Sequence, residues 1–143
     1  MRTLLKRILM VLVVALAAVA FVTAASAQKK KYPWEKEPGP IAGKWKATCP
    51  ASGNLQIEFR LVGDKKASGT IAELGGAGKY GYKQGEEIFR VAADDFGEWV
   101  GQLKWRSVAG AERWDPVRLV ATPEKLNATM TTDDCYKNMP RVR

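Results

Sequence analysis

The chain has 143 residues, no histidine, two cysteines and a formal net charge of +8. Without histidine there is no Ser-His or Cys-His catalytic pair, and the most common metal ligand is missing, so the sequence predicts no enzyme, no metal site and no cofactor. The charge does not indicate a nucleic-acid binder either. The excess cations lie at the two ends, and residues 32–140 carry 15 basic and 15 acidic side chains.

Residues 1–27 have the pattern of a cleavable secretory signal peptide. A positively charged start precedes an apolar run over 8–22, and small residues at 25–27 precede Gln28. The run of 15 residues is shorter than the roughly 20 that span a bilayer. Gln28 also replaces the cysteine that a bacterial lipoprotein requires. The pattern predicts a periplasmic or secreted protein with no membrane span after cleavage; an uncleaved anchor is the alternative.

The mature chain is expected to have three parts. Residues 28–42 form a basic, proline-rich leader whose composition favours an extended, unpaired conformation, with Trp34 as a candidate for packing against the domain. Residues 43–140 form one domain of ordinary size. Residues 141–143 are a basic tail, expected to be solvated or loosely attracted to anionic surfaces.

Within the domain, apolar residues alternate with polar ones at a period of two, which is typical of half-buried strands. The clearest alternation covers residues 54–61. Further alternating segments cover 43–49, 67–74, 86–93, 99–106, 117–121 and 126–131. Short turns rich in glycine, proline and aspartate separate these segments. The pattern predicts an all-β fold, a small up-and-down antiparallel β-barrel of seven or eight strands.

Cys49 and Cys135 are the only two cysteines, and both lie in the exported part, which predicts a disulfide that closes the barrel. The chain-entropy model gives a bridge over so long a loop roughly 4–5 kcal/mol. Cys49 ends the first expected strand and Cys135 follows the last one, and in an eight-stranded meander these ends lie at opposite rims. Either the number of strands is odd, or the chain reverses near 133–134 and brings Cys135 back.

The five tryptophans and four tyrosines suggest a binding surface. Aromatic side chains on an inward face make good walls for a planar or apolar ligand. Arg90 and Arg118 are also candidates, because an arginine that points into the barrel needs an anionic partner or an anionic ligand. The candidate ligand-binding residues are Trp45, Trp99, Leu103, Trp105, Arg90 and Arg118. The alternative is that the aromatic rings simply fill the barrel, as the interior of a small barrel requires.

The segment Gly43-Lys44-Trp45 resembles the Gly-x-Trp motif with which the calycins, the group of lipocalins and avidins, open their first strand. The alternating segment 53–61, then Ser-Gly-Thr-Ile at 68–71 and Gly-Gln at 101–102, are similar to the order seen in avidins. This resemblance covers about half of the mature chain and implies a barrel. It does not imply biotin, because the biotin-binding residues of avidins cannot be placed here one by one.

Residues 76–80, Gly-Ala-Gly-Lys-Tyr, with the segment 85–89, resemble the Ser-Gly-x-x-Tyr loop and next strand of periplasmic C-type lysozyme inhibitors, although glycine or alanine replaces the serine. This resemblance implies a partner-binding loop with Lys79, Tyr80 and Tyr82. Lysozymes are cationic, however, and the neutral body of this domain is a poor electrostatic match for them.

Two functional hypotheses follow from the sequence. The first is an exported, non-enzymatic β-barrel that binds a small hydrophobic or aromatic ligand. The second is a periplasmic protein–protein module, either similar to a lysozyme inhibitor or an adaptor for an envelope protein. An open aromatic cavity favours the first hypothesis, and a filled barrel with an exposed aromatic loop favours the second.

Overall fold

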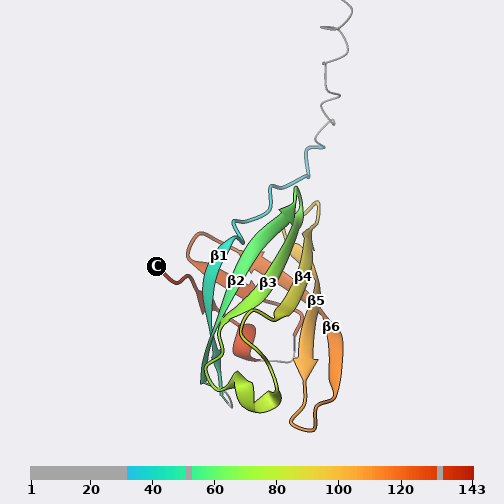
Figure 1. Ribbon diagram of the computed structural model, residues 1–143. Helices are drawn as coiled ribbons and strands as arrows, with labels where there is room; N and C mark the ends of the chain where they lie inside the picture. Colours follow the sequence, from blue (N-terminus) through green and yellow to red (C-terminus); the bar gives the residue numbers. More distant parts are fainter. Residues whose placement is uncertain (1–31, 51–52, 132–133) are drawn as a thin grey trace, which may run out of the picture. The chain divides into compact units, whose positions relative to one another are not determined.

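The computed structural model describes residues 32–50, 53–131 and 134–143, so the predicted signal peptide lies outside the described residues. The described chain forms one antiparallel sheet whose strand order in space follows the sequence (Figure 1). Its elements are β1 (Gly43–Cys49), β2 (Gly53–Gly63), β3 (Lys66–Glu73), η1 (Ala77–Tyr80), β4 (Glu87–Ala93), β5 (Trp99–Arg106), β6 (Glu112–Ala121), β7 (Lys125–Ala128), η2 (Asp134–Tyr136) and β8 (Met139–Pro140). The predicted all-β, up-and-down antiparallel fold is confirmed.

The period-two alternation determines which side chains enter the core. In β2, Leu55, Ile57 and Phe59 are buried, whereas Arg60 on the opposite face is exposed. Leu61 departs from this pattern, because it is 55% exposed although the alternation places it inside. It lies close to the β2–β3 turn, past the last core residue of the strand, where the pairing register shifts between Leu61 and Gly63.

The two edges of the sheet meet through the C-terminal residues, which makes an almost closed barrel. β8 pairs with β7 at two positions, and the chain then continues along β1. Arg141 forms a bridge with Trp45, and the amide of Val142 donates a hydrogen bond to the carbonyl of Lys44 at 2.9 Å. Arg141 is therefore part of the barrel, and its expected place in a solvated basic tail is wrong.

The predicted disulfide between Cys49 and Cys135 is present, with the two Cα atoms 4.2 Å apart. Cys135 lies in η2, between β7 and β8, and not after the last strand. Seven strands precede it, so β1 and β7 run in the same direction and end at the same rim. The odd count before Cys135 resolves the topological problem. The sequence missed β8 because two residues are too few to show an alternation.

One end of the barrel is closed by the segment that precedes β1. Ile41 is 1% exposed, and its carbonyl accepts a hydrogen bond from the indole of Trp45 at 2.8 Å. The carbonyl of Gly39 accepts another from the indole of Trp99 at 2.9 Å. The last residues of the leader therefore pack against this end of the barrel and are not unpaired, as the composition had predicted. Trp34, the candidate for packing against the domain, is exposed.

Arg141 completes this closed end. Its guanidinium lies 4.1 Å from the centroid of the Trp45 ring. It also donates hydrogen bonds to three backbone carbonyls, those of Pro40 at 2.7 Å, Ala42 at 2.8 Å and Pro123 at 2.7 Å. Gly43 leaves room for it, because a Cβ atom there would lie 2.3 Å from Nη1 of Arg141. The backbone φ of 128° at Gly43 is likewise one that glycine favours.

The centre of the core is aromatic. The rings of Phe59 and Phe89 are 5.2 Å apart, and Phe89 meets Tyr136 edge-on at 5.1 Å. Gly69 on β3 makes this packing possible, because a Cβ atom there would lie 2.8 Å from the Phe59 ring. The middle of the barrel is therefore filled with large aromatic side chains.

Candidate functional site

The other end of the barrel holds a cavity of about 650 Å³. Its lining residues come from the end of β1, the η1 segment, the β5–β6 hairpin and η2. These elements can be followed in Figure 1. The lining residues are Cys49, Pro50, Leu55, Ile71, Ala77, Tyr80, Tyr82, Ile88, Leu103, Trp105, Arg106, Ser107, Val108, Arg113, Asp115, Thr131, Asp134, Cys135 and Tyr136. The barrel is thus packed at one end and hollow at the other.

The size of the inward-facing side chains explains this difference. The closed half carries tryptophan and phenylalanine on its inward positions, but at the cavity the same strands carry Leu55, Ile71, Ile88 and Leu103. These aliphatic side chains are buried, and they are smaller than the aromatic rings of the closed half. They form an apolar floor and wall for the cavity.

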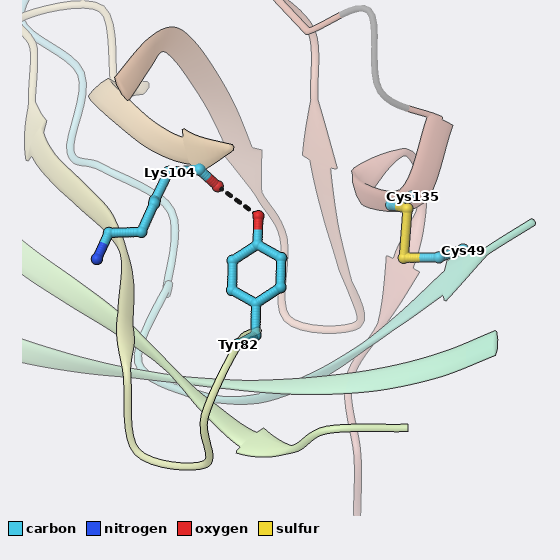
Figure 2. The surroundings of a disulfide bond; sticks show 4 residues. All are labelled: Cys49, Tyr82, Lys104 and Cys135. Carbon is cyan, nitrogen blue, oxygen red and sulfur yellow. Dashed lines mark hydrogen bonds between the residues drawn. A yellow bond between two sulfur atoms is a disulfide. The ribbon is translucent and has the colours of Figure 1, made fainter. Parts of the chain in front are cut away.

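Aromatic rings complete the apolar lining, and two of them come from the loop around η1. Gly81, in the left-handed conformation with φ 80°, separates Tyr80 from Tyr82, and its amide donates to the carbonyl of Gly78 at 2.9 Å. The Tyr82 hydroxyl donates to the backbone carbonyl of Lys104 at 3.3 Å. Figure 2 shows this hydrogen bond together with the disulfide, and Tyr82 and both cysteines line the cavity.

The η1 loop is held against β5 by a cluster of ion pairs. Glu86 pairs with Lys104 at 3.1 Å and with Arg106 at 2.7 Å. Arg106 also pairs with Glu112 and donates to the carbonyl of Gly81 at 2.6 Å. Because Glu86, Lys104 and Arg106 are largely shielded from solvent, their ion pairs hold the η1 loop against β5.

The same cluster perturbs the titration of its members. Burial alone would raise the pKa of Glu86, but hydrogen bonds from the Lys83 amide, Arg106 and Lys104 hold it below its ordinary value. The pKa of Glu112 is likewise lowered, chiefly by its hydrogen bond with Arg106. The pKa of Arg106 is raised, first by Glu112 and then by Glu86. Glu86, Glu112 and Arg106 are therefore ionised at neutral pH.

The remaining wall is polar and comes from the first half of β6. Arg113 and Asp115 both line the cavity, and Nε of Arg113 donates to the two carboxylate oxygens of Asp115 at 2.8 and 2.9 Å. The Arg113 guanidinium also lies 3.9 Å from the centroid of the Trp105 ring. β6 pairs with β7 only from Leu119 to Ala121, so this side of the cavity has no neighbouring strand among the described residues.

The sequence-predicted ligand-binding residues separate into three groups. Leu103 and Trp105 line the cavity. Trp45 and Trp99 face inward as predicted, but they are 0% and 3% exposed in the closed half and lie outside the cavity lining. For these two residues the alternative, that the rings fill the barrel, describes the structure.

Arg90 and Arg118 do not point inward. Arg90 pairs with Glu87 on the outer surface and lies 4.2 Å from the Trp114 ring. Arg118 pairs with Asp94 at 3.2 Å and with Glu98. Their place among the inward-facing candidates is therefore wrong, because the alternation of β4 and β6 directs both to the outer face.

The structure places the loop predicted to bind a partner beside the cavity. Tyr80 and Tyr82 line the cavity, and Lys79 lies outside the lining, with its ammonium 5.1 Å from the Tyr80 ring. The two tyrosines thus belong to the same site as Leu103 and Trp105. The inward arginine of this site is Arg113, which the sequence analysis did not select.

No group of three or more potential ligand side chains in the described part of the chain is placed to hold a metal ion. No helix there is long and apolar enough to cross a membrane. Comparisons with protein-family models, with curated proteins and with solved structures found no match for this chain. The protein is an all-β, disulfide-bonded, nearly closed barrel, and its cavity is the candidate functional site.

Proposed function

We propose that this protein is a non-enzymatic binding module that holds a small hydrophobic or aromatic ligand in the cavity at the η1 end of the barrel. The observation that carries the proposal is the cavity of about 650 Å³, lined by aliphatic and aromatic side chains. Its volume falls within the range of small-molecule sites, roughly 300–1,000 Å³, and such sites are lined mainly by apolar groups with a few polar ones.

The way the walls are held supports the same function. Tyr82 is fixed by its hydrogen bond to β5, and η2 is tied to β1 by the disulfide. A cavity that already exists requires little ordering when the ligand enters, so less of the binding free energy is lost. Burial of an apolar ligand contributes about 25 cal/mol per Å² of apolar surface removed from water.

The second hypothesis, a protein–protein module that uses the 75–85 loop, receives less support. Tyr80 and Tyr82 are half-buried and form part of the cavity wall, so both rings contribute to the site of the first hypothesis. We also propose that the protein is exported, because of the signal-peptide pattern, and the disulfide is compatible with an oxidising compartment. The resemblance to calycins is a further proposal, supported by the Gly-x-Trp motif at the closed end.

The proposal is tested by titrating the purified, disulfide-bonded protein with N-phenylnaphthylamine, an uncharged probe whose fluorescence rises in apolar surroundings. We expect saturable binding to the native protein. Trp105→Ala removes part of the cavity wall and should weaken binding, whereas Trp114→Ala is the matched control. Trp114 is also half-buried and also has an arginine stacked on its ring, but it lies on the outer face of β6.

Folding of both variants is checked by thermal unfolding, so that loss of structure is not mistaken for loss of binding. A native protein that shows no saturable fluorescence increase contradicts the proposal. Equal losses of affinity in Trp105→Ala and Trp114→Ala also contradict it, because the probe would then bind elsewhere.

A further inference from the structure

We propose that the ligand carries an anionic group and that Arg113 binds this group at the mouth of the cavity. The ligand would then be an amphiphilic acid, with an apolar aliphatic or aromatic part inside the barrel. This inference rests on the proposed function, because it names the chemical class of ligand for the same cavity.

The first argument is the orientation of Arg113. It occupies an inward position of β6, and its guanidinium is held between the Trp105 ring at 3.9 Å and the Asp115 carboxylate. Both hydrogen bonds that it donates to residues the structure describes leave from Nε. The N–H groups of Nη1 and Nη2 therefore remain available, and they match the two oxygens of a carboxylate in a bidentate geometry.

The second argument concerns the other charges at the cavity. Arg106 uses Nη1 and Nη2 for the Gly81 carbonyl and for Glu86 and Glu112, so it has no comparable donor to offer. Among the described residues, each lining carboxylate already has a cationic partner: Asp115 has Arg113, and Asp134 has Lys137 at 2.6 Å. The available hydrogen-bond donors therefore favour an anionic ligand over a cationic one.

The third argument is the position of Arg113 relative to the apolar wall. Its side chain is 55% exposed, whereas Ile71, Ile88 and Leu103 deeper in the cavity are buried. A ligand with its charged end at Arg113 keeps that end in contact with water, so little charge is desolvated. Its apolar part can then replace water against the aliphatic side chains.

The test compares decanoate, decanol and decyltrimethylammonium, three ligands with the same chain and different charge, by displacement of N-phenylnaphthylamine. We expect decanoate to bind most tightly. Arg113→Gln should weaken decanoate about tenfold, equivalent to about 1.4 kcal/mol, and leave decanol and the probe nearly unchanged. Arg113→Lys retains the charge without the bidentate geometry. Its affinity for decanoate should lie between that of the native protein and that of Arg113→Gln.

Arg60→Gln is the matched control, because it removes the same charge from the outer face of β2, where the side chain is 75% exposed. It should leave the affinity for decanoate unchanged. If decanol or the cation binds as tightly as decanoate, or if Arg113→Gln weakens decanol as much, the anion site is refuted while the apolar cavity stands. If neither the probe nor any of the three ligands binds, both the anion site and the proposed function are refuted.

Discussion

Replacing Arg141 with alanine removes the side chain that closes one end of the barrel. The structure gives this side chain three hydrogen bonds to backbone carbonyls and a contact with the Trp45 ring. Hydrogen bonds from a charged donor contribute roughly 1.5–3 kcal/mol each when shielded, and a cation–π contact contributes about 0.5–2 kcal/mol. Water can replace part of these contacts at the accessible rim, so we expect a total loss of about 2–4 kcal/mol.

Urea unfolding of the disulfide-bonded protein, followed by tryptophan fluorescence, measures this loss as a lower midpoint of unfolding. Arg143→Ala is the control, because Arg143 is exposed and lies two residues further along the same segment. It should change stability by less than about 0.5 kcal/mol. If Arg141→Ala also costs less than about 1 kcal/mol, its contacts do not hold the closed end and the account of barrel closure is refuted.

Three further predictions concern stability. Replacing Cys49 and Cys135 together by serine should cost about 2–5 kcal/mol in urea unfolding and weaken binding of the probe, because η2 lines the cavity; unchanged stability would contradict this. The folded pKa of Glu86 lies below its ordinary value of 4.5, so the stability it contributes is present above that pH and is lost as the pH falls through the lowered pKa. Unfolding free energies measured between neutral pH and about pH 3 should therefore decline less steeply in Glu86→Gln than in the native protein, and identical slopes would contradict the assignment. Phe59→Ala should cost about 3–5 kcal/mol as a cavity-forming substitution, whereas Glu58→Gln next to it should cost little; similar losses in the two variants would contradict the inside–outside assignment of β2.

The architecture was predictable because the alternation in most strands is local and strong. In β2 and β5 every second side chain faces the core as the sequence indicates, apart from Leu61 near a turn. The disulfide was predictable from cysteine count alone. By contrast, the closure by Arg141 depends on contacts with residues about 100 positions earlier, and no local pattern encodes such a pairing.

The candidate site was predicted only in part, for a physical reason. Inward alternation identifies Trp45, Trp99 and Trp105 equally, but it does not tell which end of the barrel is filled. That depends on side-chain volumes summed over all strands and on the leader residues that cap one end. Pro116 interrupts β6, so the clear alternation from Val117 onward does not include Arg113. Extended back past Pro116, it places Arg113 on the inward face.

The most direct test of the ligand-binding account is a map of the methyl groups that contact bound N-phenylnaphthylamine, obtained from intermolecular nuclear Overhauser effects. The account predicts contacts with the methyl groups of Ile71, Ile88 and Leu103, which line the cavity. Leu61 and Val62 offer the contrast, because they are exposed apolar residues at the opposite end of the barrel. Contacts confined to these two residues would contradict the account.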